Sequence, residues 1–155
     1  MPSLLAVDLG LRTGLALFGD DGRLRWYRSQ NFGSAPRLRR AVPALLREPG
    51  GLAWVVAEGG GPLGDIWKKE AERQRIPYRQ VAAADWREPL LLTREQRTGT
   101  MAKRNADTLA RRVIEWSGAP RPTSLRHDAA EAILLGLWAV REVGWLEALP
   151  ERLRG

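Results

Sequence analysis

Two short runs of almost wholly apolar residues, each closed by a carboxylate, constrain this chain more than any other feature. The first run covers residues 3–8 and ends at Asp8, and the second covers residues 52–57 and is followed by Glu58. Apolar runs of this length are typical of buried strands. Because ligands gather at the strand ends of an α/β sheet, the two acids predict a site at one sheet edge.

The remaining pattern predicts how the sheet is built. Residues 15–18 and 23–32 indicate two further strands around an Asp-Asp-Gly hairpin signal, so the chain opens with three antiparallel strands. Strands at 52–57 and 78–82 then alternate with helices, which are expected after Ser34 and at 65–75, 102–116 and 127–143. Residues 86–98 are expected to form a loop with a helical start. This order predicts one α/β domain over residues 1–155, a mixed five-stranded sheet covered by helices.

Composition excludes several kinds of chemistry. The chain has no cysteine and a single histidine, His127, which rules out disulfides, thiolate zinc sites and multi-histidine metal sites. A metal would therefore be held mainly by oxygen ligands, as Mg²⁺ or Mn²⁺ is. The formal net charge of +7 indicates a polyanionic partner, with nucleic acid first, although an arginine-rich surface without a partner would give the same excess.

The beginning of the sequence bears on localisation. It enters the first apolar run without a basic region or a cleavage site, and no apolar run is long enough to cross a bilayer. We therefore expect a soluble cytoplasmic protein, associated with the nucleoid if it binds DNA, and no membrane partner.

A second pair of acids opens the last expected helix. Asp128 and Glu131 are three residues apart, which places them on one helix face. Two-metal phosphodiester hydrolysis needs carboxylates around ions about 4 Å apart. Each acid also has a purely structural interpretation: Asp8 and Glu58 could shape turns, Asp128 could complement the helix dipole, and Glu131 could be exposed. The combination of all four favours a metal site.

These segments resemble, in the same order, the motifs of the RuvC-type Holliday junction resolvases. The resemblance lies in residues 6–16 (AVDLGLRTGLA), 54–59 (WVVAEG) and 127–134 (HDAAEAIL). Residues 99–104 (GTMAKR) are similar to the stretch in which a basic residue opens the family's third helix. Trp86-Arg87 resembles the Trp-Lys dipeptide of the plant chloroplast resolvases.

The resemblance implies an RNase H-like fold, a homodimer and cleavage of branched DNA such as the four-way junction. It further implies two Mg²⁺ or Mn²⁺ ions and a basic catalytic residue, Lys103, near the scissile phosphate. The implied metal ligands are Asp8, Glu58, Asp128 and Glu131, and His127 is a candidate additional ligand. Two features depart from the family: Glu131 stands where many bacterial members have aspartate, and residues 90–97 form a longer segment than expected.

Basic residues and two tryptophans are candidates for contacts with DNA or a second subunit. Lysine and arginine would bind phosphate, and Trp86 could stack on or wedge between bases. The expected nucleic-acid contacts are Arg12, Lys68, Lys69, Trp86, Arg87, Arg97, Lys103 and Arg104. A solvated charged face is the alternative for the basic residues. The helix at 65–75, with Ile66 and Trp67, is the expected dimer interface, although core packing is the alternative for Trp67.

Three other functions were weighed. The Asp8-x-Gly10 turn with Thr13-Gly14 also resembles the phosphate loop of sugar kinases and actin-like ATPases, but this chain is too short for their two domains. That pattern also leaves Glu58 and the later acid pair without a role. An RNA-processing nuclease of the same fold and a non-catalytic junction-binding module remain open. Metal-dependent cleavage of a four-way junction, compared with cleavage of an RNA precursor, distinguishes them.

Overall fold

The sheet in this computed structural model, which describes residues 2–90 and 99–153, has five strands in the order β3-β2-β1-β4-β5. The strands are β1 (Ser3–Asp8), β2 (Arg12–Gly19), β3 (Leu24–Asn31), β4 (Leu52–Glu58) and β5 (Tyr78–Val81). β1, β2 and β3 are antiparallel, whereas β4 pairs in parallel with both β1 and β5. The mixed sheet with an antiparallel opening, predicted from the sequence, is thereby confirmed.

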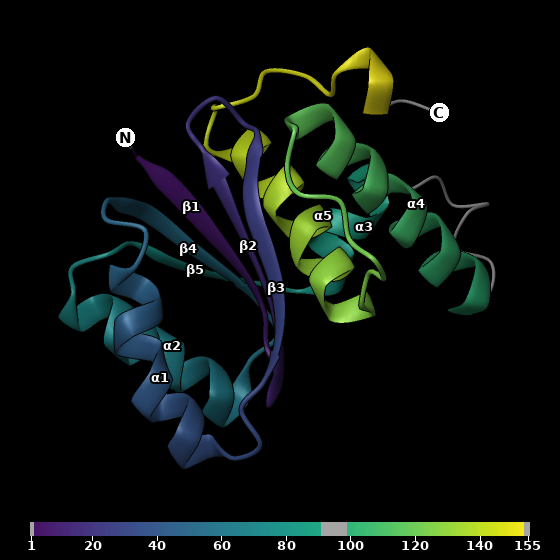
Figure 1. The fold of residues 1–155 in the computed structure, drawn as a ribbon. Coiled ribbons are helices and arrows are strands. Elements are labelled where there is room, and N and C mark those ends of the chain that lie inside the picture. The colour runs from purple at the N-terminus through teal and green to yellow at the C-terminus, as the bar shows by residue number, and fades with distance from the viewer. Residues whose placement is uncertain (1, 91–98, 154–155) are drawn as a thin grey trace.

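Helices cover both faces of this sheet (Figure 1). α1 and α2 lie on one face, and α3, α4 and α5 lie on the other. Their bounds are α1 (Ala35–Arg47), α2 (Gly61–Arg73), α3 (Ala83–Leu90), α4 (Gly99–Ser117) and α5 (His127–Glu142), followed by a short 3₁₀ helix (Glu151–Leu153). The two apolar runs therefore form neighbouring central strands that are buried from both sides, which is why they lack the alternation of a half-exposed strand.

α5 is the most deeply buried helix of the described chain. Every residue from Ala129 to Val140 is buried, because the sheet lies on one side of the helix and α3 and α4 on the other. Its approach to the sheet depends on Gly136, where an added Cβ would lie 2.1 Å from the ring of Phe18. Within residues 2–90 and 99–153, no helix has the length and apolar character needed to cross a membrane.

Two helices differ from the sequence-based expectation. α2 begins at Gly61 rather than at residue 65, because Pro62 occupies the first turn, where its missing N–H costs no hydrogen bond. The helical start expected at residue 86 is α3, which begins three residues earlier, at Ala83, and ends at Leu90. The Asp85 carboxylate accepts a hydrogen bond from the Ala82 backbone N–H at 2.8 Å, which is half of a capping box.

Candidate active site

Asp8 and Glu58 lie side by side at the carboxyl edge of the sheet. They are direct partners in the parallel ladder between β1 and β4, and each is the last residue of its strand. Both are half-buried. Two acids that are 50 positions apart in the sequence thus share one level of the sheet because two buried strands end together.

The amino end of α5 brings the second acid pair to the same edge. Asp8 pairs across the antiparallel ladder with Gly14 of β2, and a Cβ at Gly14 would lie 1.9 Å from the carbonyl oxygen of Asp128. The glycine therefore lets the first turn of α5 rest directly on the ladder beside Asp8. Gly14 belongs to a sequence motif, but its contact with α5 was not predicted; the available signal for it is the Thr13-Gly14 pair in the return strand.

The charges of the other three carboxylates all act on Asp8, so these acids lie within electrostatic reach of it. Burial raises the pKa of Asp8 most, the charges of Glu58, Glu131 and Asp128 add to the rise in that order, and these effects together bring the pKa to about 7. A hydrogen bond with Glu58 acts in the same direction. We call Asp8, Glu58, Asp128 and Glu131 the acidic edge. A cation that binds among these carboxylates relieves their mutual repulsion, which favours its binding.

Protein groups hold two of these carboxylates through neutral donors. The indole N–H of Trp86, in α3, donates to Oε1 of Glu58 at 3.1 Å. The Ser29 hydroxyl, in β3, donates to Oδ2 of Asp128 at 2.9 Å, while Oδ1 accepts the backbone N–H of Ala129. Sequence reasoning missed Ser29, because one serine in a strand carries no signal of a partner 99 residues away.

Glu131 has charged neighbours instead. Its side chain is 4% exposed, and Oε1 lies 2.6 Å from a guanidinium nitrogen of Arg87 and 2.9 Å from Nε2 of His127. His127 thus contacts the acidic edge as a partner of Glu131. In the described part of the chain, no three acidic or histidine side chains stand together in a way that could surround one ion. The donors still suit a hard divalent cation, since they are almost all carboxylate oxygens.

The structure corrects the role expected for Trp86. Its side chain is fully buried in the core between α3, α5 and the sheet, so a base cannot stack on it in this conformation. The expectation failed because its sequence neighbours are polar. Arg87 is 31% exposed and faces Glu131 rather than an open surface.

The other predicted DNA contacts fall into two groups. Arg12, Lys68 and Lys69 are exposed, the first at the start of β2 and the others on α2. Arg97 lies outside the described residues. Lys103 and Arg104 belong to α4, but their side chains also lie outside the described part.

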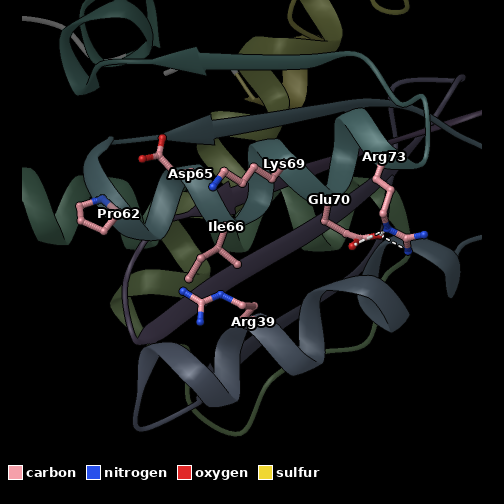
Figure 2. Close-up of a pocket in the computed structure, with 7 residues that line it drawn as sticks. All are labelled: Arg39, Pro62, Asp65, Ile66, Lys69, Glu70 and Arg73. Carbon is pink, nitrogen blue, oxygen red and sulfur yellow. Dashed lines mark hydrogen bonds and ion pairs between the residues drawn. The ribbon is translucent and has the colours of Figure 1, made fainter.

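A cleft of about 360 Å³ separates α1 from α2 (Figure 2), and the acidic edge does not contribute to its described lining. It is lined by Arg39, Pro62, Asp65, Ile66, Lys69, Glu70 and Arg73. The full burial of Trp67 against the sheet confirms the core packing that was one of its two expected roles, and not the contact with a second subunit, because its position on α2 points it inward. Ile66 lines the cleft and remains a candidate for that interface.

No protein-family model matches the sequence, and no curated protein matches it at a significant level. Among solved structures, the fold is similar to RuvC of T. thermophilus in complex with a Holliday junction substrate, with a TM-score of 0.61, 15% identity, and 93% of this chain and 97% of that chain covered. It is also similar to Ydc2, the yeast mitochondrial Holliday junction resolvase, with a TM-score of 0.50, 14% identity, and 93% and 81% covered.

A weaker likeness links the chain to the large terminase nuclease of the thermophilic phage G20c with bound zinc. Its TM-score is 0.48 at 16% identity, over 90% of this chain and 80% of that chain. At these identities the comparisons establish a shared fold with RuvC and Ydc2.

Proposed function

We propose that this chain is a structure-selective endodeoxyribonuclease that cleaves branched DNA, with the four-way junction as its substrate. In this proposal residues 1–155 form one RNase H-like domain, and the acidic edge is the active site. The observation that carries the proposal is the convergence of Asp8, Glu58, Asp128 and Glu131 at one sheet edge. The fold shared with two Holliday junction resolvases supports the choice of substrate.

The acidic edge would hold two Mg²⁺ or Mn²⁺ ions. Bound there, such ions activate water and stabilise the charge on the leaving oxygen of a phosphodiester. The residues of this chain would position the carboxylates that bind these ions. Trp86 and Ser29 fix the carboxylates of Glu58 and Asp128, and the burial of Glu131 restricts its rotamers. Asp8 must lose its proton before it can bind a cation well, since only the charged form is a strong ligand.

Binding of DNA would rest on basic side chains rather than on the acids. Arg12, Lys68 and Lys69 are exposed, and the sequence adds Arg97, Lys103 and Arg104. Contacts with phosphate make affinity fall steeply with salt. Lys103 is the candidate for stabilising charge at the scissile phosphate, a role that rests on the family resemblance.

We further propose that the active form is a homodimer, because a four-way junction is resolved by two cuts related by twofold symmetry. Helix α2 is the candidate interface; Ile66 itself is 8% exposed, at the cleft between α1 and α2. Light scattering at micromolar concentration, with and without junction DNA, measures the assembly. A monomer in both conditions would exclude the dimer.

The test is cleavage of a synthetic four-way junction in Mg²⁺ or Mn²⁺, compared with duplex DNA, single-stranded DNA and a structured RNA precursor. We expect cleavage of the junction alone, abolished by EDTA. Preferential cleavage of the RNA would make the chain an RNA-processing nuclease. Junction binding without cleavage under any metal condition would make it a binding module.

A further inference from the structure

Glu131 needs a positive neighbour in order to remain charged where it is. A carboxylate with 4% exposure has lost most of its hydration, and a charge in that position is strongly destabilising unless a cation pairs with it. Arg87 provides that cation, with a guanidinium nitrogen 2.6 Å from Oε1. His127 contacts the same oxygen, but histidine is charged only when protonated, whereas arginine carries its charge at every accessible pH.

The position of Arg87 is set by its neighbour in α3. Trp86 is buried and donates to Glu58, so this one dipeptide contacts two members of the acidic edge. The guanidinium carbon of Arg87 lies 5.0 Å from the centroid of the Trp86 ring, within the range of a cation–π interaction. With 31% of its side chain exposed, Arg87 can also turn toward solvent without unfolding α3.

A divalent ion and Arg87 would compete for the same carboxylate. Oε1 of Glu131 already accepts donors from Arg87 and His127, so a metal ion that uses this oxygen must replace at least one of them. The ion would also bring two positive charges close to the guanidinium, and charges of like sign repel strongly in a partly buried site.

We propose that Arg87 is the resident counter-cation of the acidic edge, pairing with Glu131 in the metal-free protein and leaving it when a divalent ion binds. This inference rests on the proposed function, since it requires the acidic edge to bind metal. Arg87 is then a positioning residue: its 2.6 Å ion pair orients the Glu131 carboxylate until the ion takes over. It also weakens metal binding by the free energy needed to break the pair.

Direct titration with Mn²⁺ at pH 8 tests the inference without measuring cleavage. For Arg87→Gln we expect a Kd for Mn²⁺ about threefold to tenfold lower than that of the wild type, because the competing cation is gone. Without metal, the same variant should have a lower Tm, because Glu131 is left buried and charged. Saturating Mn²⁺ should then raise its Tm by more than it raises that of the wild type.

Three further variants separate this role from general packing. Arg87→Lys restores the charge and should return both the Kd and the metal-free Tm toward wild type. Arg111→Gln removes an arginine from a 2.9 Å ion pair with Asp107 in α4, on an exposed surface, and should change neither quantity. Arg87→Met, which keeps an unbranched stem beside Trp86, replaces Arg87→Gln if that variant does not fold.

The outcomes distinguish failure of the role proposed for Arg87 from failure of the proposed nuclease function. A folded Arg87→Gln or Arg87→Met protein that binds Mn²⁺ with the wild-type Kd, or more weakly, overturns the inference and leaves the nuclease proposal standing. Absence of Mn²⁺ binding in the wild type and in every Arg87 variant overturns the metal site itself, and the inference with it.

Discussion

The backbone of Gly14 lies against the first turn of α5 so closely that a Cβ atom there would be 1.9 Å from the carbonyl oxygen of Asp128. Gly14 is also the ladder partner of Asp8. One glycine therefore sets how closely the acid of β1 and the acids of α5 approach one another. The dimensions of the acidic edge depend on backbone packing as much as on the carboxylates.

We predict that Gly14→Ala displaces α5 and lowers both stability and activity. The methyl group meets backbone atoms that cannot move independently, so we expect a loss of about 1–3 kcal/mol, as for other overpacked cores. Chemical denaturation measures this loss. Junction cleavage should fall at least tenfold even at temperatures where the variant is folded.

Gly19→Ala is the matched control, since Gly19 also lies in β2 but its Cβ would meet the end of the Arg25 side chain, which can move away. It should be close to wild type in stability and rate. Equal behaviour of the two variants would show that the close approach at Gly14 does not matter.

The second prediction concerns the charge on Asp8. Asp8→Asn should abolish cleavage, because the metal site loses a ligand charge, while the Kd for junction DNA changes less than about twofold, because binding rests on arginine and lysine. Single-turnover cleavage and a binding titration in Ca²⁺ measure the two effects. Parallel loss of binding in a folded variant would contradict this division of roles.

The same substitution should stabilise the metal-free protein, in a way that depends on pH. The pKa of Asp8 is raised from 3.8 in the unfolded chain to about 7 in the fold. The folded state therefore holds a proton that the unfolded state releases, and the free energy of unfolding falls as pH rises between these values. Above pH 7 the full cost of holding a charged Asp8 in the folded protein is present, and near pH 4 this cost is almost absent.

Thermal unfolding in EDTA tests whether stability falls as pH rises. At pH 8 Asp8→Asn should melt about 2–6 °C above the wild type, and at pH 4 the two should melt together. Binding of Mg²⁺ to the metal-free wild type should tighten as pH rises toward about 7, because Asp8 must lose its proton to bind the ion. A stabilisation that is the same at both pH values would remove ionisation of Asp8 as its cause.

The sequence predicted the parts of the fold that depend on local pattern. β1 and β4 were found because an apolar run closed by an acid has few other interpretations, and the spacing of Asp128 and Glu131 placed both on α5. The contact between Arg87 and Glu131 was not predictable in this way. Arginine beside a tryptophan is equally typical of a DNA contact, and only the packing of α3 on α5 decides between them.

The burial of the tryptophans, likewise, could not be deduced from their neighbours in the sequence. Trp86 lies among polar residues in the sequence yet is fully buried, because α3 turns that one position toward α5. For Trp67 the sequence left core packing and an interface open, and the side chain is fully buried against the other face of the sheet. In both cases the orientation of a short amphipathic helix depends on tertiary contacts that come from distant segments.

The last prediction separates the two interpretations of Trp86. Phenylalanine keeps most of the buried ring but removes the N–H that donates to Glu58 at 3.1 Å. Trp86→Phe should therefore lower the single-turnover rate about tenfold and leave the Kd for junction DNA unchanged, because a buried ring does not reach a base. Trp67→Phe is the control, since that indole is equally buried and its N–H donates no hydrogen bond within the described structure. It should leave the rate unchanged. If Trp86→Phe instead has a normal rate and weakened junction binding, Trp86 contacts a base, as the sequence predicted. Trp86 would then not be a positioning residue for Glu58.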